Sequence, residues 1–515
     1  MVKPSKLFLI ITILLAVLAA FSILMPRGGI RIGSLTLRYP TAVQLLGFDS
    51  ASHKSSFQLH PELALLETFL DSITRETSID TTFIWQDVDI FELADTVSND
   101  HSDTLKGAST AASTSITVDI LKSRLVPIQY PDSTLDALGT FFNALASGKT
   151  KNHQVRVMHY GDSQIEGDRI TSFLRLRLQS RFGGSGVGLL HAVPHSYQPG
   201  AVYQSTSSNW RQVLLADLGR GGVEHRFGLL GGYSEFTKGR RNTKGGFNEA
   251  WIKFERRGRH TSSPRNFTKC KVFYGQAAEP FMVSVSYGGN TQDGEMFAPA
   301  KGMKQVEWSI PRSENYFQIE FKGDESPHIY GISLESPTGV IVDNIAIRGS
   351  SGTDFTRADE YSLKTAFQQV NPKLVILQFG VNVVPHIVES YSYYENQMYQ
   401  QIRAIKRALP NASVLLIGVS DMAMRDGGQY VSYPNVEKIR DAQRDAAFRA
   451  GAAFWDCFEA MGGRNSMPAW AFATPALASK DFVHFTLRGS NLIAEMFYSA
   501  LMESFREYEL KSINN

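Results

Sequence analysis

From residue 155 to its end, the chain alternates between short strands, of which the one at residues 374–379 is a nearly continuous apolar run, and amphipathic helices. The strands are predicted at residues 155–160, 374–379, 414–417 and 452–455, and the first helix at residues 166–182. Strands that are apolar throughout and are joined by helices belong to a parallel sheet covered on both faces. The sequence therefore predicts an α/β fold built on a parallel sheet.

Residues 200–340 interrupt this alternation with a different pattern. Short stretches of alternating apolar and polar residues, such as Phe281–Tyr287 and 316–321, are separated by glycine-containing turns. A period of two with frequent turns is typical of antiparallel strands that are buried on one face. We therefore predict an all-β sandwich at residues 200–340, inserted into the α/β domain.

Residues 7–25 form an apolar run without a charged side chain, and Lys3 and Lys6 precede it. Its length is close to the roughly 20 residues that span a bilayer. We favour an uncleaved membrane anchor within residues 1–29, with a cleaved signal peptide as the alternative. An anchor would associate the chain with the inner membrane. Whether residues 1–29 are an anchor or a cleaved signal peptide, we expect the rest of the chain to work in the cell envelope, as a periplasmic, membrane-anchored or secreted protein.

Residues 30–130 connect this segment to the α/β domain, and the sequence assigns them no function. Within them, residues 98–118 are rich in Ser, Thr and Ala and contain no aromatic side chain, which predicts a linker. The first part of the α/β domain is expected at residues 131–199 and begins with a short helix. Its buried face is predicted to hold Leu135, Leu138, Phe141, Phe142 and Leu145.

Composition limits what the chain can bind. There are 52 Lys and Arg against 50 Asp and Glu, a formal net charge of +2, which argues against nucleic acid as a partner. The two cysteines, Cys270 and Cys457, are too few for a disulfide scaffold or a cysteine zinc cluster, and two buried free thiols are favoured over one disulfide. The spacing of the histidines near residue 163 gives no metal signature, so no cofactor is predicted. The oligomeric state is not predicted.

Two short motifs could supply a nucleophile and its base. Gly161-Asp162-Ser163 directly follows the first predicted strand, where ligands bind in an open parallel sheet. Asp481 and His484 lie close together near the C-terminus, so one loop can present both. A serine hydroxyl needs a neighbouring base, usually histidine, and the histidine needs a carboxylate to hold its tautomer. Each motif taken separately is more often a turn or a helix cap.

Two further residues could stabilise an oxyanion. Asn382 lies just after the predicted strand 374–379, and an amide there can donate to developing negative charge. Gly349 follows a short predicted strand, and a glycine lets a ligand approach a backbone N–H. We favour Gly349 over Gly352 because Gly349 comes immediately after that strand. Either residue alone is most often just part of a turn.

Taken together, the four motifs resemble the SGNH/GDSL hydrolase superfamily, whose blocks occur in the order Gly-Asp-Ser, Gly, Gly-x-Asn and Asp-x-x-His. The resemblance covers about residues 150–200 and 340–510 and implies a flavodoxin-like, three-layer hydrolase domain. It further implies Ser163 as the nucleophile, His484 as the general base and Asp481 as its partner, with an oxyanion hole formed by Ser163, Gly349 and Asn382. The chain departs from the usual pattern at Gln164, where leucine is common, and at Val383, where an acid often stands.

The place of the inserted β region is similar to that in bacterial peptidoglycan O-acetylesterases, in which a sandwich like a carbohydrate-binding module is inserted at this point. The resemblance implies hydrolase parts at residues 131–199 and 341–515. It also implies a serine esterase that removes O-acyl, preferably O-acetyl, groups from a cell-envelope or other polysaccharide. The alternatives are an O-acetyltransferase with the same triad and a non-catalytic glycan-binding envelope protein.

The insertion also carries tryptophans that could stack on sugar rings, although core packing is the favoured interpretation. They are Trp210, Trp251 and Trp308.

Overall fold

The computed structural model describes residues 30–32, 35–37, 126–131, 135–146, 149–194, 199–214, 228–236, 248–258, 263–291 and 294–514. The chain divides into two compact units, Met1–Gln58 and Leu59–Asn515. In the first unit, β1 (Ile30–Ile32) pairs antiparallel with β2 (Leu35–Leu37). The predicted anchor at residues 7–25 and the predicted linker at residues 98–118 lie outside the described residues. Within the described ranges, no helix combines the length and the apolar character needed to cross a membrane.

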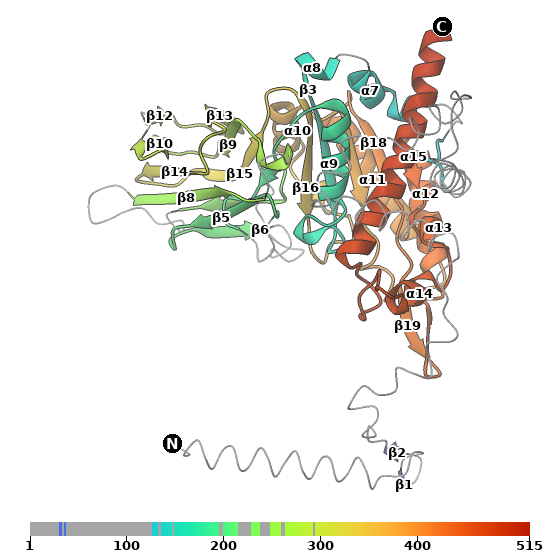
Figure 1. The fold of residues 1–515 in the computed structure, drawn as a ribbon. Helices are drawn as coiled ribbons and strands as arrows, with labels where there is room; N and C mark the ends of the chain where they lie inside the picture. Colours follow the sequence, from blue (N-terminus) through green and yellow to red (C-terminus); the bar gives the residue numbers. More distant parts are fainter. Residues whose placement is uncertain are drawn as a thin grey trace, which may run out of the picture. The chain divides into compact units, whose positions relative to one another are not determined.

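The second unit contains a five-stranded parallel sheet, as the alternation of strands and helices predicts (Figure 1). Its strand order is β16 (Gly339–Ala346), β3 (Gln154–Gly161), β17 (Leu374–Gln378), β18 (Ser413–Ile417) and β21 (Ala453–Trp455). Each neighbouring pair is parallel. All residues of β17, β18 and β21 are buried, which explains why these strands are apolar except at Gln378 and Ser413.

Helices cover both faces of this sheet and make three layers. One face packs against α7 (Asp136–Leu145), α9 (Thr171–Phe182), α13 (Cys457–Met461), α14 (Ser466–Phe472) and α15 (Leu487–Asn514). The other face packs against α10 (Glu360–Val370), α11 (Ser392–Ala408) and α12 (Val436–Arg449). The predicted apolar face of α7 is buried.

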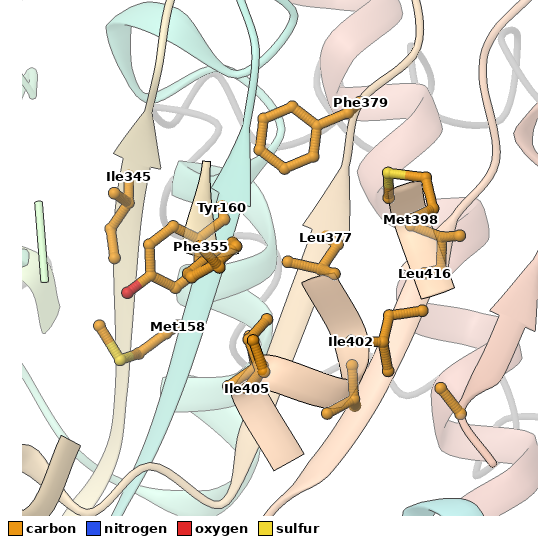
Figure 2. Close-up of a cluster of buried hydrophobic side chains, with 14 of the residues drawn as sticks. Met158, Tyr160, Ile345, Phe355, Leu377, Phe379, Met398, Ile402, Ile405 and Leu416 are labelled. Atoms are coloured by element: carbon orange, nitrogen blue, oxygen red, sulfur yellow. The ribbon is translucent and has the colours of Figure 1, made fainter. Parts of the chain in front are cut away.

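The core on the second face shows why α11 forms where it does. Met398, Ile402 and Ile405 lie on one side of the helix at a spacing of three to four residues and are fully buried. Figure 2 shows them beside Leu377 of β17 and Leu416 of β18. Burying each such side chain stabilises the fold by roughly 1.5–3 kcal/mol, so this face fixes the helix against the sheet.

The inserted region forms two antiparallel sheets. The first contains β5 (Val202–Thr206), β8 (Asn248–Arg256), β10 (Phe281–Tyr287), β11 (Asn290–Thr291), β12 (Glu295–Phe297) and β14 (Tyr316–Gly323). The second contains β4 (Gly188–Leu190), β6 (Arg211–Leu214), β7 (Gly232–Glu235), β9 (Lys269–Gly275), β13 (Lys304–Ser309) and β15 (His328–Glu335). Side chains from both sheets share one apolar core, so the region is a sandwich.

The ends of the sandwich differ from the predicted limits of 200 and 340. Its first strand, β4, pairs with β15, although residues 131–199 were assigned to the hydrolase domain. At the other end β15 stops at Glu335, and Gly339 already belongs to the parallel sheet. A strand of three residues is too short to show a period of two, so the sequence pattern did not indicate β4.

Both cysteines of the chain and two tryptophans of the insertion contribute to hydrophobic cores. Cys270 and Cys457 are buried free thiols, as favoured from the sequence. Trp210 lies in the sandwich core and Trp308 packs against it, while Trp251 is half-buried. The favoured core interpretation therefore holds for Trp210 and Trp308.

A buried cluster of charges joins the sandwich to the parallel sheet. Arg156 of β3 donates to Asp343 of β16 over 2.8 Å and also pairs with Glu335 of the sandwich strand β15. Lys271 of β9 reaches Glu335 over 2.5 Å. Burial would raise the pKa of Glu335, but the charges of Arg156 and Lys271 lower it to about 2. Each buried charge in this cluster therefore faces an opposite charge.

Candidate active site

Three neighbouring strands end level with one another at the carboxyl edge of the parallel sheet. Gly161 of β3 is paired with Ala346 of β16 on one side and with Gln378 of β17 on the other. Because β3 precedes both of its neighbours in sequence, the chain changes direction here, and ligands bind at such points in open α/β sheets. The loops after the three strands carry the predicted residues Ser163, Gly349 and Asn382.

The turn that presents Ser163 requires the glycine before it. A Cβ on Gly161 would lie 2.9 Å from the carbonyl oxygen of Gln378 and equally close to the side chain of Ile165, so no other residue fits. The turn is closed by hydrogen bonds from the Ile165 N–H to the Asp162 carbonyl and from the Glu166 N–H to the Ser163 carbonyl, both over 3.4 Å. Ser163 is half-buried in this turn.

The helix predicted at residues 166–182 begins later than expected. Residues Glu166–Asp168 form a single 3₁₀ turn, and α9 begins only at Thr171. Asp168 and Ile170 have φ values of 64° and 61°, which break the helical path. Asp168 is held there by Arg175, whose two guanidinium nitrogens donate to its carboxylate over 2.6 and 2.9 Å. This buried ion pair and the positive φ values thus start the helix later than the apolar periodicity predicted.

The structure brings Ser163, His484 and Asp481 together although Ser163 is more than 300 residues away in sequence. Ser163 Oγ lies 2.8 Å from His484 Nε2, and His484 Nδ1 lies 2.7 Å from Asp481 Oδ2. A carboxylate only accepts, so Nδ1 carries the proton and Nε2 is left to accept from the Ser163 hydroxyl. The side chains of His484 and Asp481 are 28% and 48% exposed, so the group is open to solvent.

Asp481 is held as an anion by its surroundings. Partial burial would raise its pKa, but the hydrogen bond from His484 and the backbone N–H groups of Val483 and His484 lower it below the ordinary range. Its Oδ1 accepts from those two N–H groups, each over 3.0 Å, which leaves Oδ2 for the imidazole. The carboxylate is therefore ionised at neutral pH and its orientation is fixed.

Gly349 and Asn382 lie in loops that are joined by a hydrogen bond. Asn382 Nδ2 donates to the carbonyl of Ser350 over 2.8 Å, and the amide retains a second N–H. Gly349 has a φ of 78°, the left-handed region that favours glycine. The N–H of Gly352 donates to the Ser350 side chain over 2.9 Å and is therefore occupied inside its own loop. This contact favours Gly349 over Gly352 as a donor to a ligand.

The role of Asp162 was not predicted from the sequence, in which it is only the middle residue of the Gly161-Asp162-Ser163 motif. Asp162 is buried, and this burial raises its pKa from the ordinary 3.8 to about 7 against the opposing effect of N–H groups from Gln164, Val381 and Gly380. Because Val381 and Gly380 precede Asn382, the carboxyl connects the loop of Ser163 with the loop of Asn382. Nothing in the spacing indicates this contact.

The role of His159, which lies in β3 two residues before Gly161, was also not predicted from the sequence. Burial lowers the pKa of His159 to about 4, so this histidine is neutral. Its ring nitrogens lie 3.0 Å from Gln378 Oε1 and 3.0 Å from Thr171 Oγ1, and Asn344 donates to Thr171 over 2.7 Å. These hydrogen bonds thus link β3, β16, β17 and the start of α9.

Within the described ranges no group of three or more His, Cys, Asp or Glu side chains is arranged to hold a metal ion.

Residues 322–492 match the model of the GDSL-like lipase/acylhydrolase family. The match includes Gly349, Asn382, Asp481 and His484. Ser163 lies outside it, because the inserted sandwich separates the serine turn from the rest of the hydrolase domain. No curated protein matches the chain.

Solved structures give the wider comparison. A structure titled "Peptidoglycan O-acetylesterase in action" is 23% identical, covers 74% of this chain and 99% of its own, and has a TM-score of 0.57, which shows a common fold. A family two carbohydrate esterase from Clostridium thermocellum is 10% identical, covers 50% of this chain and 92% of its own, with a TM-score of 0.23. An acetyl xylan esterase is 17% identical, covers 31% and 81%, with a TM-score of 0.25.

The resemblance predicted from four short motifs is thus confirmed by a family match over the second hydrolase segment and by a common fold over most of the chain. Residues 322–492 thus form part of a GDSL-type carboxylic ester hydrolase domain.

Proposed function

We propose that the chain is a serine esterase that hydrolyses O-acyl esters, preferably O-acetyl esters, on a cell-envelope or other polysaccharide. The observation that carries the proposal is the continuous hydrogen-bonded series from Ser163 Oγ to His484 and on to Asp481, with distances of 2.8 and 2.7 Å. This geometry suits a hydroxyl that loses its proton as it attacks.

In the first half of the reaction, Ser163 Oγ attacks the ester carbonyl carbon while its proton passes to His484 Nε2. Asp481 stabilises the resulting imidazolium. The oxyanion accepts hydrogen bonds from the N–H groups of Ser163 and Gly349 and from the second amide N–H of Asn382. When the tetrahedral intermediate collapses, the sugar oxygen takes the proton from His484 and leaves, so an acyl group remains on Ser163.

In the second half, water attacks the acyl carbon and gives its proton to His484. Collapse of the second intermediate returns that proton to Ser163 Oγ and releases the carboxylic acid. The free enzyme is restored without a cofactor, which agrees with the absence of any predicted cofactor. If a sugar hydroxyl replaced water in this step, the same residues would transfer the acyl group instead.

A polymeric substrate is favoured by the exposure of the site. His484 and Asp481 are 28% and 48% exposed, and Ser163 is half-buried, so an ester projecting from a long chain can reach the serine. A glycan is favoured by the likeness in fold to a solved peptidoglycan O-acetylesterase, which covers 74% of this chain. The apolar run at residues 7–25 supports a place in the cell envelope, to which that segment would anchor or export the hydrolase.

The proposal is tested by measuring acetate released from p-nitrophenyl acetate and from O-acetylated glycans by the full chain and by Ser163→Ala. We expect the substitution to lower kcat by more than about 10⁴-fold. Ser512→Ala, which changes an exposed serine of α15, is the matched control and should keep full activity. Equal acetate release by the wild type and Ser163→Ala would contradict the esterase. Acetyl groups recovered on an added sugar rather than as free acetate would identify a transferase.

A further inference from the structure

Gln164 lies directly after Ser163 and connects the serine turn to the loop that carries His484. Its side chain is buried, and Nε2 donates to the carbonyl of Val483 over 2.6 Å and to Ser420 Oγ over 3.2 Å. A carbonyl oxygen can only accept, so the amide nitrogen must face Val483. The backbone N–H of Gln164 donates to Asp162 Oδ1 over 3.0 Å, which fixes the residue at its other end.

The contact with Val483 fixes the peptide unit that carries His484. The carbonyl of that unit belongs to Val483 and accepts from Gln164, and the N–H belongs to His484 and donates to Asp481 Oδ1 over 3.0 Å. The unit is therefore held on both sides, and it cannot turn without breaking one bond. Since Gln164 is bonded to Ser163 along the chain, a single side chain sets the position of His484 relative to the nucleophile.

The loop from Asp481 to His484 needs such support because its backbone is strained. Phe482 has a φ of 58°, a conformation that costs a bulky residue more than it costs glycine. Its ring stacks on Tyr430 at 3.9 Å between centroids, and its carbonyl accepts from the Ala423 N–H over 3.1 Å. The hairpin of β19 (Ala423–Asp426) and β20 (Gln429–Ser432) thus supports one side of the loop, and Gln164 supports the side next to Ser163.

We propose that Gln164 is a positioning residue for catalysis, which holds His484 Nε2 within reach of Ser163 Oγ through its hydrogen bond to the Val483 carbonyl. This inference rests on the proposed function of the Ser163–His484–Asp481 triad. It explains why an amide stands where related hydrolases commonly have leucine: leucine fills the same space but cannot donate to Val483.

The test compares Gln164→Met with Gln179→Met in the full chain. Methionine keeps the length of the side chain and removes the donor. Gln179 is the matched control, because its buried amide also donates to two backbone carbonyls, Gly186 and Val340, at the side of α9 that faces the sandwich. We measure kcat and KM on p-nitrophenyl acetate, the thermal midpoint, and the downfield proton NMR signal of the His484 Nδ1–H.

We expect Gln164→Met to lower kcat by about 10²-fold with KM unchanged, since a misplacement of about 1 Å can have this effect. The His484 Nδ1–H signal should weaken or shift in this variant and stay unchanged in Gln179→Met, while both variants lose thermal stability. The proposal is overturned if kcat and the signal are unchanged in Gln164→Met, or if both variants lose kcat equally.

Gln164→Glu is the second variant, because it keeps the shape and, when ionised, repels the Val483 carbonyl; it should lose at least as much kcat. If neither Gln164 variant shows a cooperative thermal transition, Gln164 is required for folding rather than positioning, and the proposal is wrong. If the wild type hydrolyses no ester, the proposed function fails, while the NMR signal still decides whether Gln164 positions His484.

Discussion

Glu335, at the junction between the sandwich and the parallel sheet, and Asp162, in the turn around Ser163, are both buried carboxyl groups, but their surroundings shift their pKa values in opposite directions. At the junction, Glu335 faces Arg156 and Lys271, and its pKa is lowered to about 2. At the active site, Asp162 has only backbone N–H groups around its carboxyl, and burial raises its pKa to about 7. Glu335 is therefore held as a stabilising anion, whereas the site keeps Asp162 in a position where ionisation costs stability.

The backbone shows the same difference. Around the site, Asp168, Ile170 and Phe482 have positive φ values although none is glycine. In the described part of the sandwich, one non-glycine residue, Gln276, has a positive φ (47°), and strands β8 and β14 pair regularly over eight residues. Strain persists only where the surrounding contacts impose it, and here those contacts hold Ser163 and His484 in place. The regular sandwich strands therefore stabilise the fold, whereas the strained residues around the site position Ser163 and His484.

The largest expected effect in this comparison comes from Glu335→Gln. The substitution leaves Lys271 without its buried partner and removes one of the two carboxylates around Arg156, so the free energy of unfolding should fall by about 3–5 kcal/mol. Chemical denaturation measures the loss, and kcat per folded molecule should be unchanged. Glu307→Gln is the control: Glu307 also contacts Lys271, over 3.7 Å, but is exposed, so about 1 kcal/mol or less is expected. Equal losses in the two variants would contradict a special role for the buried cluster.

Asn382→Ala should act in the opposite way, on catalysis and little on stability. Asn382 is exposed, so its removal leaves no buried cavity, but the oxyanion loses one donor. We expect kcat on p-nitrophenyl acetate to fall by about 10²–10³-fold with KM little changed. Asn396→Ala changes an exposed asparagine of α11 and serves as the control. A loss below about threefold in Asn382→Ala would exclude this amide from the oxyanion hole.

The last expected effect is the pH dependence of stability that Asp162 contributes. Its pKa is raised on folding, so between about pH 4 and pH 7 the unfolded chain is ionised while the folded chain keeps the proton. Stability therefore falls as pH rises over this range, and the fall ends near pH 7, where the folded state also ionises.

Asp162→Asn cannot titrate, so the difference in unfolding free energy between this variant and the wild type isolates the contribution. The variant should become more stable relative to the wild type from pH 4 to pH 7 and gain nothing further above it. A difference that does not change with pH would show that Asp162 is ionised in the folded protein as it is in the unfolded chain.

The sequence predicted the parallel sheet, the sandwich and the candidate site residues because each leaves a local signal. The strands at 374–379 and 414–417 are almost entirely apolar, and the motifs at Ser163, Gly349, Asn382 and His484 fall in the order of a known family. It did not predict the late start of α9, because the positive φ values of Asp168 and Ile170 leave no signal in the apolar periodicity. The roles of Asp162 and Gln164 were missed because both contact loops more than 200 residues away.

The most direct test of the central claim is covalent labelling by a fluorophosphonate, which reacts with a serine only when a neighbouring base activates it. The labelled full chain is digested and the modified peptide is identified by mass spectrometry. The account predicts a single modification at Ser163 that is lost in Ser163→Ala and is slowed by at least about 10³-fold in His484→Ala. Labelling at another serine, or at Ser163 with the same rate when His484 is absent, would contradict it.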